Sequence, residues 1–154
     1  MIAVDYQNPT QYIFENYNVW NLEEVVDNHS EEPSEYCIPI EEWEIEFLKN
    51  CVQAEAGGEP DEAKRGVCDV ILNRVLNPSS PDSVYGVITQ KYRFTSYWDG
   101  GMERHKEISD NTSAIVEEEL RAGPLHNDWY WFTSDGYGRN GKPICQIGNM
   151  YFGG

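Results

Sequence analysis

Basic residues are scarce in this sequence. Its 154 residues include 11 Lys and Arg against 27 Asp and Glu, which gives a formal net charge of −16. Proteins that follow nucleic-acid phosphates need a surplus of basic residues, so this deficit excludes nucleic acid as a partner. No apolar run approaches the roughly 18 residues of a membrane helix, and we expect no membrane span. The start lacks the features of a signal peptide, so export would need a partner, cell lysis or a leader outside this sequence.

Motifs for metals, phosphates and nucleophiles are also lacking. The three histidines form no H-E-x-x-H pattern, the four cysteines contain no C-x-x-C pair, and no glycine-rich phosphate loop is present. We therefore expect no metal and no cofactor. The cysteines are expected to be mainly buried reduced thiols, with one disulfide as the alternative: Cys37, Cys51, Cys68 and Cys145.

The negative charge is unevenly distributed along the chain. Residues 1–50 contain 12 acidic residues and a single basic one, Lys49. Residues 1–40 show no sustained helical or alternating period beyond a short turn near residues 19–26. We therefore predict an acidic N-terminal arm over residues 1–40, followed by one folded domain over residues 41–154. Such an arm could hold a separate protein partner, and a protein acting only through that arm is one alternative function.

Helical periodicity begins after the arm. An apolar stripe at three-to-four spacing predicts a helix from Glu41 to the glycine pair that starts at Gly57. Pro60 is typical of the start of a second helix, which should run to Asn77. A short helix is expected over residues 84–90, followed by an aromatic loop over residues 91–109. The third long helix is expected to begin at a cap formed by Asn111 or Thr112 and to end before Gly123.

The C-terminal part has the composition of strands. The β-prone segments DWYWFTS and PICQIGNMYF, over residues 128–134 and 143–152, are separated by a turn rich in glycine. Alternation places Trp129 and Trp131 on one face of the first strand and Tyr130 on the other, and one of these faces should lie in the core. Helices followed by strands predict an α+β fold: a compact helical domain with a small C-terminal antiparallel sheet.

Glu55 is the strongest candidate for chemistry. It lies in the last turn of the first predicted helix, among apolar neighbours and just before two glycines. A carboxyl group in a partly desolvated cleft has a raised pKa, which suits it to donate a proton near neutral pH. The alternative is a surface glutamate at a helix end. Arg74 is expected to have a structural role at the end of the second helix, with an ion pair to Glu55 as the alternative.

Several motifs occur in one order along residues 48–152: EAGGEP at 55–60, NRV at 73–75, PDSVYGVI at 81–88, Gln90 and Phe94 ahead of Asp99 and Gly100, Leu120 with Gly123, and IGN at 147–149 before Phe152. In these motifs the sequence resembles the spore cortex-lytic, SleB-like cell wall hydrolases. Met150 and Ser80 depart from the family pattern, which leaves the general class unchanged. Residues 1–40 are not covered by the resemblance.

The resemblance implies an enzyme that cleaves peptidoglycan glycan strands at the cell wall, with Glu55 as its acid. It also implies a lysozyme-like, lytic-transglycosylase-like fold with a cleft between helices and sheet. One carboxylate suffices for a lytic transglycosylase, whereas a hydrolase normally uses two. Asp99 and Glu59 are the candidates for a second carboxylate if the reaction is hydrolysis. A cell-wall binding module without catalysis is a further alternative.

Sugar binding needs flat apolar faces together with side-chain amides, hydroxyls or carboxylates. The aromatic loop and the two predicted strands contain residues of these kinds. We expect the substrate to contact six of them: Phe94, Thr95, Asp99, Trp129, Gln146 and Asn149.

Overall fold

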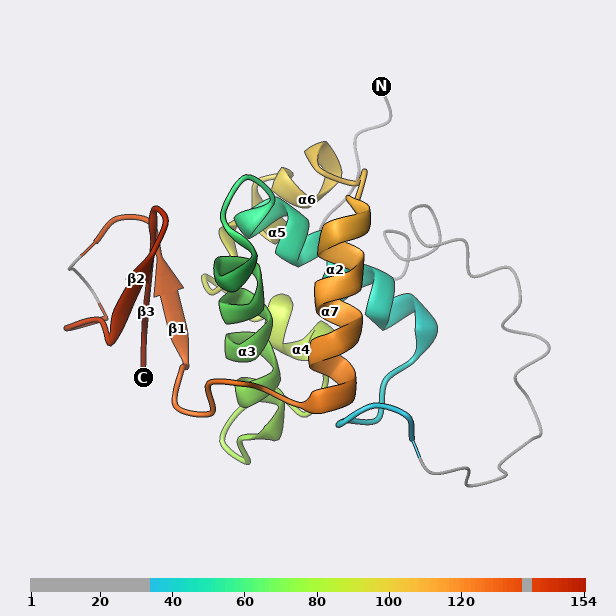
Figure 1. The fold of residues 1–154 in the computed structure, drawn as a ribbon. Coiled ribbons are helices and arrows are strands. Elements are labelled where there is room, and N and C mark those ends of the chain that lie inside the picture. The colour runs from blue at the N-terminus through green and yellow to red at the C-terminus, as the bar shows by residue number, and fades with distance from the viewer. Residues whose placement is uncertain (1–33, 137–139) are drawn as a thin grey trace, which may run out of the picture.

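The computed structural model describes residues 34–136 and 140–154. Within these ranges, helices form a cluster, and a small sheet lies beside α3 (Figure 1). The predicted α+β class is confirmed, whereas the turn expected near residues 19–26 lies outside the described residues. The elements are α2 (Glu42–Ala56), α3 (Asp61–Leu76), α4 (Val84–Ile88), α5 (Thr95–Trp98), α6 (Gly101–Arg104), α7 (Asp110–Ala122), β1 (Trp131–Thr133), β2 (Cys145–Ile147) and β3 (Met150–Gly153).

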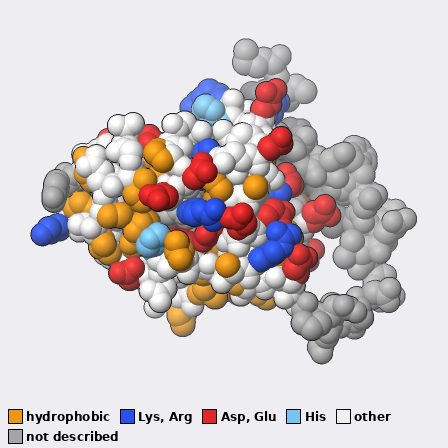
Figure 2. Space-filling view, viewed as in Figure 1, with side chains coloured by type: hydrophobic (Ala, Val, Ile, Leu, Met, Phe, Trp, Pro, Cys, Tyr) orange, Lys and Arg blue, Asp and Glu red, His pale blue; other side chains and the backbone are white. Residues whose placement is uncertain are grey.

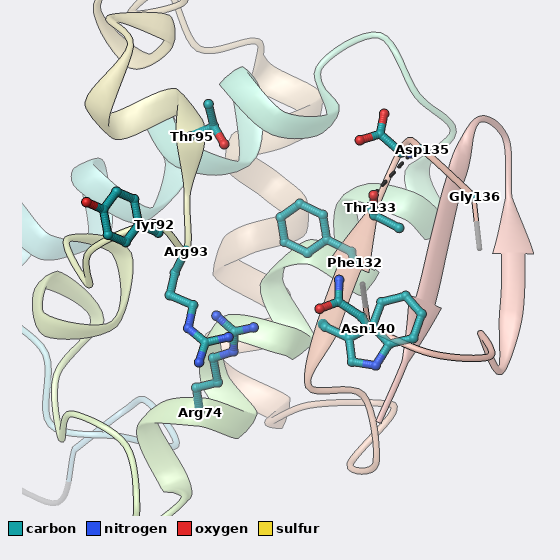
Figure 3. Close-up of a pocket in the computed structure, with 10 residues that line it drawn as sticks. Arg74, Tyr92, Arg93, Thr95, Phe132, Thr133, Asp135, Gly136 and Asn140 are labelled. Carbon is teal, nitrogen blue, oxygen red and sulfur yellow. Dashed lines mark hydrogen bonds between the residues drawn. The ribbon is translucent and has the colours of Figure 1, made fainter. Parts of the chain in front are cut away.

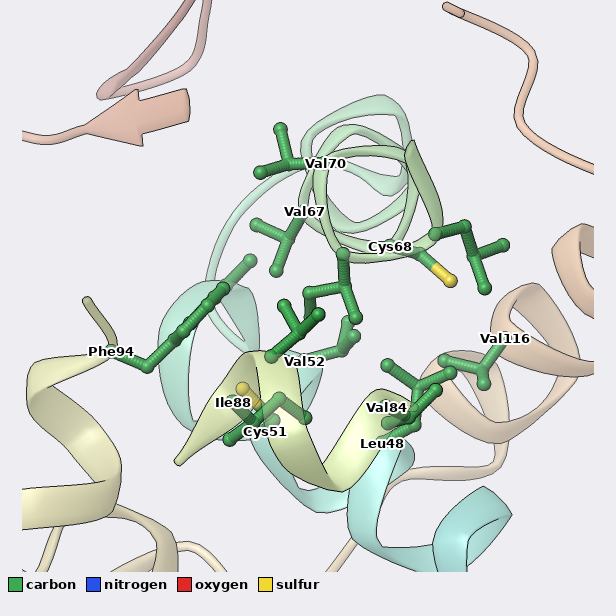
Figure 4. Close-up of a cluster of buried hydrophobic side chains, with 14 of the residues drawn as sticks. Leu48, Cys51, Val52, Val67, Cys68, Val70, Val84, Ile88, Phe94 and Val116 are labelled. Carbon is green, nitrogen blue, oxygen red and sulfur yellow. The ribbon is translucent and has the colours of Figure 1, made fainter. Parts of the chain in front are cut away.

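The predicted apolar stripe of α2 faces the core. Phe47 and Cys51 of the stripe are fully buried, and so are Leu48 and Val52 beside them; these side chains meet others from α3, α4 and α7, and Figure 4 shows this cluster between the helices. The helix ends at Gly57, as the glycine pair predicts. Burial of apolar area, at about 25 cal/mol per Å², is the main force that holds these helices together.

The loop expected over residues 91–109 is more ordered than predicted. It contains the short helices α5 and α6, joined at Gly100, whose φ of 82° favours glycine. Tyr97 and Met102 anchor the two turns in the core, with exposures of 1% and 0%. Helices this short have too few turns for a periodic pattern, so tertiary burial rather than local sequence defines them.

The predicted cap of α7 was also wrong. Ser109 caps the helix, with its hydroxyl accepting a hydrogen bond of 3.1 Å from the backbone N–H of Thr112. Asn111 instead accepts a hydrogen bond of 2.6 Å from Lys64 on α3. The capping role passes to Ser109 because Thr112 is fully buried inside the first turn.

The sheet has three antiparallel strands in the order β1-β3-β2. The segment expected to be one strand over residues 143–152 is therefore a hairpin of β2 and β3. The chain reverses at Gly148, whose φ is 56°, and a Cβ at this position would lie 2.3 Å from a carboxylate oxygen of Glu59. Glycine is required both by this backbone conformation and by the lack of space.

The sheet packs on α3 through aromatic side chains. Of the two faces of the segment around β1, the one with Trp129 and Trp131 is buried, with exposures of 4% and 9%. Tyr130, on the other face, is 36% exposed. Trp129 and Phe152 stack with ring centroids 4.7 Å apart and lie over Gly66 of α3. The missing side chain of Gly66 allows this close approach of sheet and helix.

Residues 34–40 of the predicted arm pack against α7. The backbone N–H of Cys37 donates to the Leu120 carbonyl at 2.7 Å, and the Tyr36 hydroxyl bonds Glu117 at 3.1 Å. Ile38 is 3% exposed and belongs to the core. In the space-filling view, acidic side chains interspersed with Lys and Arg gather over the α7 region, and hydrophobic side chains gather toward the sheet (Figure 2).

The cysteines follow the expectation of reduced thiols in part. All four are free: Cys51 and Cys68 are buried, Cys145 is half-buried and Cys37 is exposed. Across residues 34–136 and 140–154, no helix has both the length and the apolar character needed to cross a membrane.

Candidate active site

Glu55 faces the start of α5. Its carboxylate oxygen Oε1 accepts a hydrogen bond of 2.5 Å from the Ser96 hydroxyl. Glu55 is half-buried, and Ser96 is 8% exposed. The periodicity of α2 directs Glu55 along the same side as the buried Cys51, one turn earlier. The unpredicted helix α5 thus supplies the residue that orients this carboxyl group.

Burial has the largest effect on the protonation of Glu55. It raises the pKa, because a charged carboxylate loses hydration there, and the negative charge of Asp99 raises it further. Hydrogen bonds from the side chain and backbone of Ser96 oppose this effect by stabilising the charged form. The net pKa lies above the ordinary glutamate value. Such a carboxyl group is partly protonated at a higher pH than usual, as a proton donor requires.

A pocket of about 410 Å³ lies between the loop that precedes α5 and strand β1 (Figure 3). Thr95 lines this pocket, and the next residue, Ser96, bonds Glu55. Neither Glu55 nor Ser96 lines this pocket; the link between the candidate acid and the pocket runs through the adjacent residues Thr95 and Ser96. The lining residues are Arg74, Tyr92, Arg93, Thr95, Trp131, Phe132, Thr133, Asp135, Gly136 and Asn140.

Arg74 closes one side of the pocket. Its Nε donates to the Tyr130 carbonyl at 2.8 Å, and its guanidinium lies over the Phe94 ring, 5.5 Å from the centroid. Among the described residues no ion pair joins it to Glu55, which favours the structural role expected from sequence. Burial, together with the positive charge of Arg93, lowers the pKa of Arg74 to about 10. Sequence reasoning missed Arg93, since a single arginine in an aromatic loop gives no motif.

The residues expected to bind substrate are dispersed. Thr95 is exposed in the pocket wall, and Asp99 is close enough to influence Glu55 electrostatically. Phe94, by contrast, is only 1% exposed and packs beneath Arg74. Trp129 stacks on His126 with centroids 3.7 Å apart and lies in the core. Burial leaves these two rings little surface for a ligand.

Gln146 and Asn149 lie on the exposed hairpin. Gln146 donates to the Gly148 carbonyl at 3.1 Å. Asn149 donates twice to the Glu59 carboxylate, from its backbone at 3.0 Å and from its side chain at 3.2 Å. Glu59 therefore fixes the hairpin to the start of α3.

The other candidate for a second carboxylate, Asp99, stabilises a turn. Its Oδ1 accepts a hydrogen bond of 2.8 Å from the backbone of Gly101 and lies 3.6 Å from Arg104. The side chain is half exposed. Both candidates thus have structural partners, while Asp99 remains electrostatically coupled to Glu55.

A second group of titratable side chains lies between α3 and α7. The Asp69 carboxylate is fully buried and accepts hydrogen bonds from the backbones of Leu125 and His126, at 3.1 and 3.0 Å. Burial and the adjacent Asp69 raise the pKa of Glu119 to about 8, although Arg65 lies 3.1 Å from Glu119. The neighbouring negative charge of Asp69 thus disfavours the charged form of Glu119.

This pair was not predicted, because only tertiary packing brings the two carboxyl groups together. Within the described ranges, no three His, Cys, Asp or Glu side chains are arranged to hold a metal ion.

Comparison with known proteins gives a consistent result. Residues 58–153 match the profile of the family described as Cell Wall Hydrolase. This match starts just after Glu55. A spore cortex-lytic enzyme of Oceanobacillus iheyensis is 34% identical over 114 residues, which cover 71% of this chain and 41% of that protein. The Bacillus subtilis spore cortex-lytic enzyme is 44% identical over 93 residues, 60% of this chain and 30% of that protein. The chain therefore spans less than half the length of these relatives.

Two solved structures have a similar fold. The catalytic domain of the germination-specific lytic transglycosylase SleB from Bacillus anthracis aligns with a TM-score of 0.63 and 26% identity, covering 76% of this chain and all of that domain. The catalytic domain of Bacillus cereus SleB aligns with a TM-score of 0.65 and 22% identity, covering 80% of this chain and 99% of that domain, and supports the fold alone.

Proposed function

Because the chain belongs to the cell wall hydrolase family, we propose that it cleaves the glycan strands of peptidoglycan as a lytic transglycosylase. The observation that carries this proposal is the carboxyl group of Glu55. It is half-buried, has a raised pKa and accepts a hydrogen bond from Ser96, the chain neighbour of Thr95, which lines a 410 Å³ pocket. The relative from Bacillus anthracis, described as a lytic transglycosylase, supports this reaction class.

In the proposed reaction Glu55 first acts as the acid. Its proton passes to the glycosidic oxygen as the bond from that oxygen to the anomeric carbon of muramic acid breaks. The 6-hydroxyl oxygen of the same muramic acid then bonds to the anomeric carbon, and its proton passes to the Glu55 carboxylate. Glu55 is thereby restored, and the product carries a 1,6-anhydro end. Ser96 holds the carboxyl group in place for both proton transfers.

Hydrolysis with a second carboxylate is the alternative within the same class. Asp99 is the better candidate for this role, because its charge already raises the pKa of Glu55. Glu59 is a poorer candidate, since both of its oxygens accept hydrogen bonds from Asn149. Transglycosylation needs neither residue as a catalyst. It is therefore compatible with the structural hydrogen bonds that occupy both Asp99 and Glu59.

We further propose that Thr95 and Asp99 contact the strand beside Glu55, whereas Gln146 and Asn149 contact it from the hairpin. Phe94 and Trp129 would then support the walls from beneath rather than touch sugar. The catalytic domain is proposed to include residues 34–40 in addition to 41–154, given their packing on α7. The site of action is the cell wall, and an acidic-arm partner remains a proposal.

The mass of the products distinguishes the two reactions. Purified peptidoglycan is digested with the chain, and the released muropeptides are analysed by mass spectrometry. Anhydro-muramic ends, lighter by one water than reducing ends, are expected. Reducing ends alone would assign the chain to the hydrolases. Release of no muropeptides, with co-sedimentation on peptidoglycan retained, would indicate a binding module instead.

A further inference from the structure

Two arginines in the pocket differ from the other arginines in the described part of the chain. Arg65, Arg104 and Arg121 each form an ion pair with a carboxylate. For Arg74 and Arg93, no ion pair is found with any described residue. In a protein with a net charge of −16, acidic partners are plentiful. Two neighbouring arginines that lack an acidic partner therefore indicate a binding site for an anionic ligand.

The two guanidinium groups lie close together on one side of the pocket (Figure 3). They are near enough for the charge of Arg93 to disfavour the charged form of Arg74. Like charges at short range repel, and a bound anion would remove this repulsion. Asp135 is the one acidic side chain among the described lining residues, and it lies outside ion-pair distance of both arginines.

The surroundings of Arg74 fix the direction of its guanidinium. Its Nε is held by the Tyr130 carbonyl, and its flat face packs over Phe94. Its terminal nitrogens have no hydrogen-bond acceptor among the described residues. A planar guanidinium with two free terminal NH₂ groups matches the two oxygens of a carboxylate. Arg93 is exposed, has no side-chain partner in the described ranges and adds a second cation beside this fork.

We propose that Arg74 and Arg93 form a subsite for a carboxylate of the glycan strand. The inference rests on the proposed function, because peptidoglycan supplies this carboxylate. Its two sources are the lactyl group of muramic acid and the peptide that extends from it. The subsite would place the muramic residue beside Thr95 and therefore near Glu55, which is bonded to Ser96. It would also offset the general repulsion between an acidic protein and an anionic strand.

The test uses the variant Arg93→Gln, because this side chain is exposed and holds no other part of the fold in the described structure. Arg121→Gln removes the same charge from α7 and is the matched control, since Arg121 pairs with Glu35 and Glu117 and does not line the pocket. Both are placed in a Glu55→Gln background, so that binding is measured without turnover. Calorimetry then gives the Kd for soluble glycan strands.

Four strand preparations are compared: with and without stem peptides, and each with its carboxyl groups either free or converted to amides. For the Arg121→Gln control and the Glu55→Gln parent, amidation should weaken binding about tenfold. This factor corresponds to the lower value for the loss of a hydrogen bond to a charged group, as suits a partly exposed site. Arg93→Gln should bind free-carboxylate strands several-fold more weakly than the parent, and amidation should weaken its binding less than it weakens that of the parent, because only Arg74 then holds the carboxylate. An effect confined to peptide-free strands assigns the lactyl carboxylate, and one confined to peptide-bearing strands assigns the peptide.

Equal sensitivity of Arg93→Gln and its parent to amidation would overturn the subsite. Insensitivity of the parent itself would do the same. These outcomes concern binding and are separate from failure of the proposed function, which would appear as a wild-type chain that releases no fragments from any strand.

Discussion

Gly66→Ala tests how the sheet docks on the helices. A Cβ at this position would lie 2.6 and 2.7 Å from Cε1 and Cζ of Phe152, and 2.9 Å from Cζ3 of Trp129. The two rings cannot move away freely, because they stack on each other and Trp129 also stacks on His126. Overpacking of this kind costs typically about 1–3 kcal/mol, and contact with two rings places the cost near the upper value.

Helix propensity opposes this cost. Alanine is more favourable than glycine inside a helix by about 1 kcal/mol, so the expected net loss in the free energy of unfolding is about 2 kcal/mol. For a chain of this length, this corresponds to a fall in Tm of about 4–8 °C. Urea unfolding followed by tryptophan fluorescence measures the change. Gly58→Ala is the matched control, because no atom lies within 4 Å of the added Cβ.

The docking explanation would be refuted if Gly66→Ala were as stable as wild type or more stable, since propensity alone would then decide the outcome. A loss of stability equal to that of Gly58→Ala would refute it as well. The activity of Gly66→Ala should also fall, because displacement of β1 moves Phe132 and Thr133 in the pocket wall.

Three further predictions concern the carboxyl groups. The folded-state pKa of Glu119 is raised to about 8, so the stability that protonated Glu119 contributes is complete at acid pH and is lost as the pH rises from about 5 to 8. Glu119→Gln should abolish this fall in the free energy of unfolding measured in urea, and an unchanged pH slope would show that Glu119 does not cause it. Glu59→Ala should lower the free energy of unfolding by about 1 kcal/mol, because its hydrogen bonds to Asn149 are lost. The variant should still release muropeptides. A folded but inactive variant would instead show that Glu59 is catalytic. Asp99→Asn keeps a side-chain oxygen that can accept the hydrogen bond from the Gly101 backbone. Its turnover in an initial-rate assay should therefore stay within about tenfold of wild type. A loss of about 10²-fold or more would favour hydrolysis with two carboxylates.

Features with a local cause were predictable from the sequence. The long helices α2 and α3 follow from apolar periodicity, with Gly57 and Pro60 marking the boundary between them. Glu55 could be singled out as a candidate because its apolar neighbours and the adjacent glycines are contiguous in sequence, and its catalytic role stays a prediction. These signals act within a few residues and do not depend on the rest of the fold.

Features with a tertiary cause were not predictable. The tight reversal at Gly148 depends on the carboxylate of Glu59 packed against it, which only the tertiary fold brings there, and the hairpin was therefore expected as one strand. The burial of Trp129 depends on the space that Gly66 leaves on α3, which is distant in sequence. The sequence does not indicate this contact, and the ring was therefore expected to touch the substrate. Ser96 likewise reaches Glu55 only because the short helix α5 packs against α2, which no periodic pattern indicates.

The turnover of Glu55→Gln tests the central claim most directly. Glutamine keeps the size of the side chain and can accept the hydrogen bond from Ser96, but it cannot supply the proton. With circular dichroism confirming an unchanged fold, the rate of muropeptide release from purified peptidoglycan should fall by at least about 10²-fold. A folded Glu55→Gln variant that releases muropeptides at the wild-type rate would contradict the role of Glu55 as the acid.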